Sequence, residues 1–359
     1  MSKSGFPDFP RGRGALSNAD GSFEPYAHAA EDDGWGSADA APPPRRTTVQ
    51  ADRARSVLVY QRSPDIPFDR SINPYRGCEH GCVYCYARPS HAYLGLSPGL
   101  DFETRLFAKH DAAEVLAREL ARPGYQVAPI AFGTNTDVYQ PIERRLRVVR
   151  SLLEVLAACE HPLTIVTKSA LIERDLDLLA PMAQKRLVHA YVSVTTLDRK
   201  LARTLEPRAA APPRRLDTIR ALAQAGVPVG VLAAPMIPVL TDYELEAILQ
   251  QAAEAGASAA GYVLLRLPHE VKDLFREWLA THAPDRAAHV MSLVQQARGG
   301  RDNDPNFGSR MRGTGEYAEL LAKRFRLACR RLGLNRDTAE LDCSRFRPSL
   351  TAGAQMSLL

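Results

Sequence analysis

The stretch NPYRGCEHGCVYC at residues 73–85 decides what kind of fold this chain can have. It holds three of the chain's six cysteines, Cys78, Cys82 and Cys85, in the arrangement C-x3-C-x2-C. Six cysteines in 359 residues are too sparse for a disulfide scaffold. A group of three thiols is instead typical of a soft-metal or iron–sulfur site, and the glycine before each of the first two cysteines lets the loop wrap closely around it.

Short apolar segments alternate with longer amphipathic ones from residue 72 onward. The apolar segments predict six strands, at Ile72–Tyr75, Ile130–Phe132, Leu163–Val166, Ala190–Val194, Val229–Ala233 and Ala259–Leu264. The amphipathic segments predict six helices, at Asp111–Arg122, Glu143–Ala158, Asp175–Gln184, Pro213–Ala225, Asp242–Ala255 and Glu270–His282. These repeats predict a parallel sheet, either a doubly wound open sheet or a partial (β/α) barrel.

Polar residues, glycine or proline occur directly after most of the predicted strands. In a parallel sheet the C-terminal ends of the strands meet at one edge, so these residues should gather around the cysteine loop. They are Arg76 and the cysteines, residues 133–137, residues 167–169, Thr195 and Thr196, Pro235 and its neighbours, and Arg266. Alternation along the fourth strand predicts that Ser193 and Thr195 point to the same side.

Three cysteines leave two kinds of metal site open. A cubane [4Fe–4S] cluster held by three thiolates keeps one iron open for a chelating ligand. A structural zinc site instead needs four protein ligands. The fourth would have to be His80 or one of the remote cysteines Cys159, Cys329 and Cys343.

The cysteine motif, with Tyr84 before its third cysteine, resembles the signature of the radical S-adenosylmethionine (radical SAM) superfamily. A wider match over residues 73–89 resembles the spore photoproduct lyase-like branch, also described as DNA repair photolyase-like. Further blocks of that branch lie at residues 133–143, 167–175, 206–208 and 234–242. The resemblance covers about residues 56–350 and implies an α/β fold, a partial (β/α)6 TIM-like barrel with a helical C-terminal extension.

The resemblance also implies an enzyme with a [4Fe–4S] cluster on the three cysteines and S-adenosylmethionine at the open iron. One electron then cleaves the sulfonium and yields a 5′-deoxyadenosyl radical that abstracts hydrogen from a substrate. The residues implied to contact S-adenosylmethionine are Tyr84, Gly133, Thr134, Lys168, Ser193, Thr195, Arg208 and Pro235. Residues 133–137 lack the superfamily's usual glycine-glycine-glutamate, so backbone carbonyls or Thr134 must serve in its place.

Neither the substrate nor the catalytic hydrogen donor is identified by the resemblance. The lyase uses a cysteine downstream of its cluster as hydrogen donor, and this chain has none between Cys85 and Cys159. We expect a nucleic acid lesion or base as substrate and a flavodoxin or ferredoxin as electron donor. The competing hypothesis is a non-enzymatic nucleic-acid-binding protein whose fold is stabilised by a bound metal or cluster.

Composition divides the chain into three predicted parts. Residues 1–55 lack periodicity and predict a mostly disordered tail. Residues 56–297 predict the barrel, and residues 298–359 predict a basic helical cap and tail. The net charge is +5, and residues 298–347 carry an equal excess. Their basic helix is either a phosphate-binding surface or an ordinary solvated face.

Two further patterns bear on localisation. No stretch approaches the roughly 18 apolar residues that a membrane-spanning helix needs, and residues 1–21 lack the apolar core of a signal peptide. Thiols that must stay reduced for a cluster also require a reducing compartment. We therefore expect a cytoplasmic protein without a membrane partner.

Overall fold

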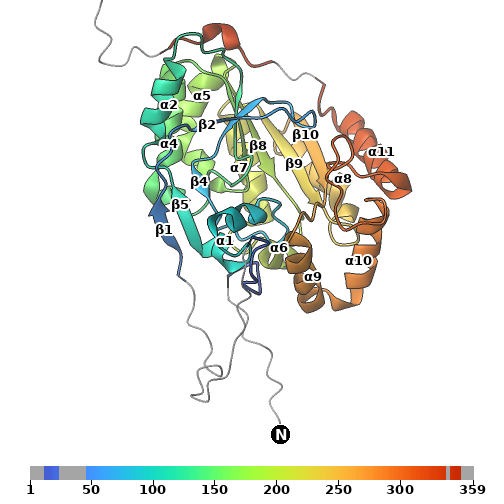
Figure 1. The fold of residues 1–359 in the computed structure, drawn as a ribbon. Helices are drawn as coiled ribbons and strands as arrows, with labels where there is room; N and C mark the ends of the chain where they lie inside the picture. Colours follow the sequence, from blue (N-terminus) through green and yellow to red (C-terminus); the bar gives the residue numbers. More distant parts are fainter. Residues whose placement is uncertain (1–11, 24–45, 337–339, 349–359) are drawn as a thin grey trace, which may run out of the picture.

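The computed structural model describes residues 12–23, 46–336 and 340–348. Its main sheet has seven strands in the order β10-β9-β8-β7-β6-β3-β2. These are β2 (Leu58–Tyr60), β3 (Arg70–Ile72), β6 (Ile130–Phe132), β7 (Leu163–Thr167), β8 (Val188–Ser193), β9 (Val229–Met236) and β10 (Ala259–Leu264). Strands β3 to β10 run parallel, and β2 pairs antiparallel with β3. In the described residues β2 and β10 do not pair with each other, so the sheet remains open (Figure 1).

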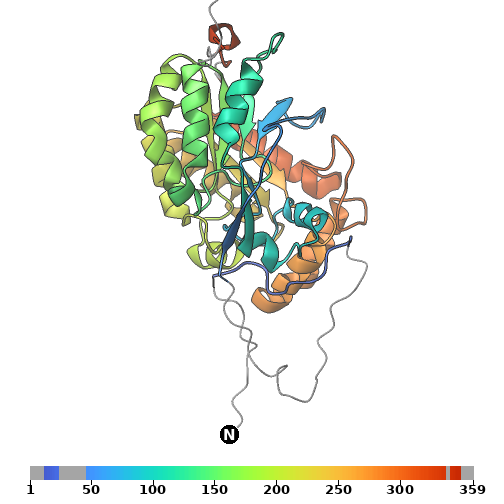
Figure 2. The same ribbon diagram turned by 60° about the vertical axis from the view of Figure 1, so that its left-hand side comes forward.

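Helices follow the strands and cover one face of the sheet (Figures 1 and 2). They are α2 (Ala112–Leu120), α4 (Val148–Ala158), α5 (Leu176–Gln184), α7 (Pro212–Gln224) and α8 (Leu245–Glu254). The shorter α3 (Glu143–Leu146) and α6 (Arg199–Leu205) lie in the connections that follow β6 and β8. α5 packs against β8, α7 against β8 and β9, and α8 against β9. The α/β fold and the strand–helix repeats predicted from the sequence are confirmed.

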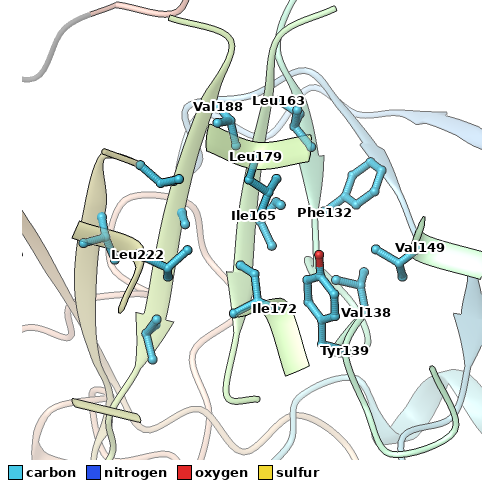
Figure 3. Packing of buried hydrophobic residues seen from close by; sticks show 14 of the residues in the cluster. Phe132, Val138, Tyr139, Val149, Leu163, Ile165, Ile172, Leu179, Val188 and Leu222 are labelled. Atoms are coloured by element: carbon cyan, nitrogen blue, oxygen red, sulfur yellow. The ribbon is translucent and has the colours of Figure 1, made fainter. Parts of the chain in front are cut away.

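Alternate side chains of the central strands form the core between the sheet and the helices. Leu163 and Ile165 of β7 and Val188 of β8 are fully buried. They belong to the same cluster as Leu179 of α5 and Leu222 of α7 (Figure 3). Each such side chain contributes ~1.5–3 kcal/mol through burial. The residues between them in β7 are only partly buried, as expected for the side of the sheet that faces away from the helices.

The first parallel strand ends three residues earlier than predicted, at Ile72. Pro74 has no N–H to donate to a neighbouring strand, so the ladder stops before it. The next two residues form β4 (Tyr75–Arg76), which pairs antiparallel with β5 (Arg105–Ala108). β5 in turn pairs parallel with β1 (Thr48–Ala51) in a second, three-stranded sheet. The cysteine loop leaves from this second sheet.

The helix predicted at residues 143–158 is divided into α3 and α4. Arg147 lies between them with φ 55°, in the left-handed region. The buried carboxylate of Glu143 accepts a hydrogen bond from the backbone N–H of Val149 (3.1 Å) in the first turn of α4. The carboxylate therefore satisfies a free N–H at the start of a new helix, which compensates for the break.

Two stretches of the predicted N-terminal tail are ordered. Residues 12–23 pack on the body of the protein, and residues 48–51 form β1. The backbone N–H groups of Gly14 and Ala15 donate to the Glu103 carboxylate (3.0 and 2.8 Å). A buried carboxylate, distant in the sequence, supplies the acceptors that hold this stretch, and the mostly disordered tail at residues 1–55 stays a prediction. The rest of the predicted tail lies largely outside the described residues.

Three helices follow the last strand: α9 (Val271–His282), α10 (Pro284–Gln296) and α11 (Gly315–Leu332). α11 packs against α8 (Figure 1). Its Arg324 pairs with Glu246 of α8 (2.6 Å), so part of the basic helix serves to fix the helix in place. No helix in the described part of the chain is long and apolar enough to cross a membrane.

The segment at residues 340–348 lies at the N-terminal ends of the strands. The N–H of Asp342 donates to the carbonyl of Arg186 (2.9 Å), shortly before β8, and the N–H of Arg347 donates to that of Cys159 (2.9 Å), shortly before β7. Cys343 therefore lies at the opposite end of the sheet from the cysteine loop and is not a fourth ligand there.

Candidate active site

The cysteine loop is held at the C-terminal ends of the strands by hydrogen bonds from the segments around it. The N–H of Cys78 donates to the carbonyl of Phe102 (2.9 Å). Nε of Arg88 donates to the carbonyl of Cys82 (2.9 Å). Cys78 and Cys82 are buried and Cys85 is partly exposed. The loop thus has a defined conformation that does not depend on a disulfide.

Glycine is required where two backbones meet under the loop. Gly81 has φ 66°, and a Cβ there would lie 2.7 Å from the Glu103 carboxylate. A Cβ on Gly14 would lie 1.7 Å from the carbonyl oxygen of Gly81. Real Cβ atoms do not come this close, so the N-terminal segment packs against the loop only because both positions lack a side chain.

The three thiols are candidate ligands of a metal centre. Burial raises the pKa of Cys78, Cys82 and Cys85, that of Cys82 to about 12, so the thiolate forms need a cation to stabilise them. In the described residues no group of three or more His, Cys, Asp and Glu side chains converges as a single metal ion requires. This donor set fits a multi-iron cluster, in which each thiolate binds a different iron.

Asp137, which follows β6, is the carboxylate beside the loop. It lies 3.3 Å from Nδ1 of His80 and accepts hydrogen bonds from the Thr167 hydroxyl and the Lys168 N–H (both 2.7 Å). Burial alone would raise the pKa of Asp137, but the charge of His80 and these hydrogen bonds outweigh burial and hold the pKa at about 2. The ionised carboxylate thereby links His80 of the loop to the ends of β6 and β7.

Tyr84 is anchored by a buried ion pair. Its hydroxyl donates to the Glu206 carboxylate and lies 3.2 Å from the Thr195 hydroxyl. Glu206 also pairs with Arg215, and both side chains are fully or almost fully buried. Burial would raise the pKa of Glu206, but Arg215 and Lys168 outweigh it and lower the pKa to about 2. The carboxylate is therefore ionised at neutral pH and keeps the Tyr84 ring in one position.

Lys168 extends from the end of β7 toward the same group of residues. Its Nζ lies 6.0 Å from the centroid of the Tyr84 ring. Burial would lower the pKa of Lys168, but the proximity of Cys82 and of the ionised Glu206 outweighs burial and raises it. Lys168 is thus a cation whose ammonium group forms no ion pair within the described residues. It remains available to an anionic ligand.

Ser193 and Thr195 point to the same side, as alternation predicts, because both hydroxyl oxygens lie 3.0 Å from the carbonyl oxygen of Ala234. The Thr195 hydroxyl also lies 2.7 Å from the Glu206 carboxylate, which is the nearer acceptor for its hydrogen. Pro235 follows directly in β9. Since its hydrogen is directed at a protein acceptor, the Ser193 oxygen keeps a lone pair for a donor on a ligand, whereas the Thr195 oxygen already lies near Glu206, Ala234 and the Tyr84 hydroxyl.

Gly133 and Thr134 lie where β6 approaches the loop. Gly133 has φ 80°, and a Cβ there would lie 2.1 Å from the carbonyl oxygen of Val166, so only glycine allows this approach to β7. The Thr134 hydroxyl lies 3.4 Å from the Asn73 side-chain oxygen. The carbonyl of Thr134 accepts a hydrogen bond from the hydroxyl of Tyr86.

Arg208 belongs to a polar chain that joins the loop to the N-terminal segment. Its guanidinium lies 3.1 Å from Glu79, between the first two cysteines. Glu79 also accepts a hydrogen bond from the Thr47 hydroxyl (2.7 Å), which in turn accepts one from Arg13 (3.1 Å). Arg208, which is implied to contact S-adenosylmethionine, is thus already paired with a carboxylate of the protein.

The structure brings the predicted site residues together around the cysteine loop, and their roles toward a cofactor remain predictions. The sequence reasoning assigned no role to several charged residues that organise the site. They are Arg88, Glu103, Asp137, Glu206 and Arg215, whereas His80 was considered only as a possible fourth zinc ligand. An acidic residue soon after a strand was a usable signal for Asp137, whereas nothing local distinguishes the buried arginines from surface ones.

The chain has relatives by sequence, and its fold is similar to that of solved structures. The family model of the Radical SAM superfamily matches residues 72–252. An uncharacterised protein of Mycobacterium bovis is 39% identical over 265 residues, which cover 73% of this chain and 76% of that protein. An uncharacterised protein of Acidianus two-tailed virus is 29% identical over 195 residues, which cover 52% of this chain and 64% of that protein.

Spore photoproduct lyase, in a solved complex with dinucleoside spore photoproduct, superposes on the chain with a TM-score of 0.57. The match covers 80% of each chain at 16% sequence identity, so it bears on the fold alone. The chain belongs to the radical SAM superfamily. Within that superfamily its fold is similar to that of spore photoproduct lyase.

Proposed function

We propose that this radical SAM protein is an enzyme that binds a [4Fe–4S] cluster at Cys78, Cys82 and Cys85, with S-adenosylmethionine beside it. The proposal rests on three thiols in one loop at the C-terminal ends of parallel strands, ringed by fixed polar groups. A bound cluster supplies the electron that cleaves S-adenosylmethionine and generates the 5′-deoxyadenosyl radical. The residues of the chain bind and orient the cofactor and exclude water.

The anionic end of S-adenosylmethionine is assigned to Lys168. Its raised pKa and its unpaired ammonium group favour a carboxylate ligand. Gly133 and Thr134 present backbone carbonyls nearby, which suit the amino group of the same methionine. Because Tyr86 already donates to the Thr134 carbonyl, the orientation of that carbonyl is fixed before the cofactor binds.

The nucleoside end is assigned to the ends of β8 and β9. The hydroxyl oxygen of Ser193 accepts a hydrogen bond from the ribose beside Thr195, and Pro235 provides a flat wall for the adenine. Tyr84, held by Glu206, closes the site toward the cysteine loop. Arg208 acts through Glu79, which it keeps in place between two of the cysteines.

The proposed substrate is a nucleic acid lesion or base. Two observations favour this class: the fold is similar to that of an enzyme solved with dinucleoside spore photoproduct, and partly buried arginines follow β10 beside the site. A flavodoxin or ferredoxin is the proposed electron donor. The need to keep the thiols reduced places the protein in the cytoplasm under this proposal.

Anaerobic reconstitution with iron and sulfide tests the site. We expect about four irons per chain and, after dithionite reduction, an EPR signal that changes when S-adenosylmethionine is added. Cys82→Ala should lose the iron and the signal. Cys159→Ala is the matched control, since Cys159 is buried behind α4 and away from the loop. A colourless protein that binds one zinc ion would instead support the non-enzymatic nucleic-acid-binding alternative.

A further inference from the structure

Arg266, two residues beyond the end of β10, is a partly buried cation without a counter-charge. In the described residues it forms no ion pair, and its Nε is buried without a hydrogen-bond partner. Its Nη1 donates to Sδ of Met311 at 3.6 Å. Burial of a guanidinium costs free energy unless donors and charge are compensated.

The residues around Arg266 make the local charge more positive. Arg298 is 3% exposed and gives its guanidinium hydrogen bonds to backbone carbonyls only. Its own Nε is also buried without a partner. Burial is the main reason that the pKa of Arg298 is lowered to about 10, and the charge of Arg266 lowers it further. Arg310 is the third arginine here, and Asp65 already neutralises it.

Arg266 also lies at the rim of the cysteine site. Its guanidinium carbon is 5.5 Å from the centroid of the Tyr86 ring. Tyr86 follows Cys85 directly, its hydroxyl donates to Thr134 at the end of β6, and 47% of the residue is exposed. A cation and an accessible aromatic ring thus lie side by side between the last strand of the sheet and the cysteine loop.

We infer that Arg266 binds a phosphate group of the substrate and that the adjacent Tyr86 ring receives one of its bases. The inference rests on the proposed function and specifies how that substrate is recognised. A guanidinium donates two parallel hydrogen bonds to a phosphate, and an aromatic ring stacks on any base. The phosphate supplies the counter-charge that Arg266 lacks within the described residues.

Binding is measured by fluorescence anisotropy on the cluster-loaded full chain under anaerobic conditions, with a labelled single-stranded oligonucleotide as probe. Arg266→Gln should weaken binding by roughly tenfold or more, and Arg266→Lys should recover part of the loss. Arg301→Gln, at an exposed arginine, should stay near wild type. Tyr86→Leu should weaken binding by about fivefold or more, whereas Tyr86→Phe keeps the stacking.

Two competitors separate the sources of the phosphate. A nucleoside monophosphate that displaces the probe from the wild-type chain, but not from Arg266→Gln, assigns the site to a free nucleotide. Displacement by oligonucleotide alone assigns it to a nucleic acid strand. An oligonucleotide with an uncharged methylphosphonate backbone should bind wild type and Arg266→Gln equally. Iron content and the visible spectrum of each variant show whether it remains folded and loaded.

The inference is overturned if wild type binds none of the charged probes, or if Arg266→Gln behaves like Arg301→Gln. Its failure is distinguishable from that of the proposed function. If wild type cleaves S-adenosylmethionine but binds the oligonucleotide equally well without Arg266, the inference fails and the enzyme assignment is retained. Arg266-dependent binding without any cleavage would instead contradict the enzyme assignment and retain the phosphate site.

Discussion

Arg88 and Glu103 form an ion pair in which neither side chain is exposed to solvent. Nη2 of Arg88 lies 2.5 Å from Oε1 of Glu103. The remaining donors of the guanidinium reach the carbonyls of Cys82, Pro98 and Gly99. Glu103 in turn accepts two backbone hydrogen bonds from the N-terminal segment. One buried pair therefore joins that segment, the cysteine loop and the start of α1 (Leu100–Thr104).

Replacing Arg88 by methionine leaves the Glu103 carboxylate buried without its counter-charge. We expect the free energy of unfolding to fall by ~3–5 kcal/mol, measured by urea denaturation of the cluster-free protein under reducing conditions. Arg220 and Asp217 form a pair that is 50% and 57% exposed. Arg220→Met should therefore cost less than ~1 kcal/mol. Equal losses for the two variants would contradict the anchoring role of Arg88.

Gly14→Val should loosen the N-terminal segment from the cysteine loop, because any Cβ at Gly14 overlaps the carbonyl of Gly81. A steric cost of ~1–3 kcal/mol corresponds to about 5- to 150-fold easier local opening. The readout is the rate at which the loaded protein loses iron in air. Gly12→Asn is the control, since nothing lies within 4 Å of a Cβ there and asparagine tolerates its φ of 74°. Identical rates for both variants would show that the segment does not protect the loop.

Lys168→Met should weaken S-adenosylmethionine binding by roughly tenfold or more, because a charge-assisted hydrogen bond to the carboxylate is lost. Isothermal titration of the reconstituted protein measures the affinity. Lys200, exposed on α6, is the control position. An unchanged affinity in Lys168→Met would mean that the carboxylate binds elsewhere, and Arg208 would be the next residue to test.

His161 should make the protein less stable as the pH falls from about 6.5 to about 4. Its Nδ1–H donates to Pro162 and its Nε2 accepts from the Tyr125 hydroxyl (both 2.9 Å), an arrangement that only the neutral ring permits. Burial lowers the pKa of His161 to about 4, whereas the unfolded chain titrates near 6.5. The unfolded state therefore binds the proton first, and up to about 3 kcal/mol is lost across this window.

Urea denaturation at several pH values measures this loss. His161→Gln should have a flatter stability profile between pH 4 and pH 6.5 than wild type. His110→Gln, at an exposed histidine, should keep the wild-type profile. Parallel profiles for wild type and His161→Gln would contradict the assignment of the neutral ring.

Local patterns in the sequence were sufficient for the repeats of the sheet and for the cysteine loop. Hydrophobic spacing predicted the strands and helices because each buries one face against its neighbours. Two of the boundary errors fall where Pro74 and Arg147 interrupt the pattern, and β9 extends three residues beyond its predicted end. Three cysteines within eight positions marked the site.

Contacts between residues that are distant in the sequence could not be predicted from local sequence patterns. The pairing of Arg88 with Glu103, and of Glu206 with Arg215, depends on how helices and loops meet in space. The ordered stretch at residues 12–23 has no periodicity of its own that would predict it. A carboxylate far along the chain holds it in place. For the same reason, several arginines of the basic C-terminal segment proved to be buried or paired.

The release of 5′-deoxyadenosine from S-adenosylmethionine tests the central claim most directly. The reconstituted wild-type protein is reduced with dithionite under anaerobic conditions, and the product is quantified by chromatography. We predict release that requires both the reductant and the iron and that disappears in Cys78→Ala, Cys82→Ala and Cys85→Ala. Fully loaded wild-type protein that releases none, or equal release from the cysteine variants, would contradict the account.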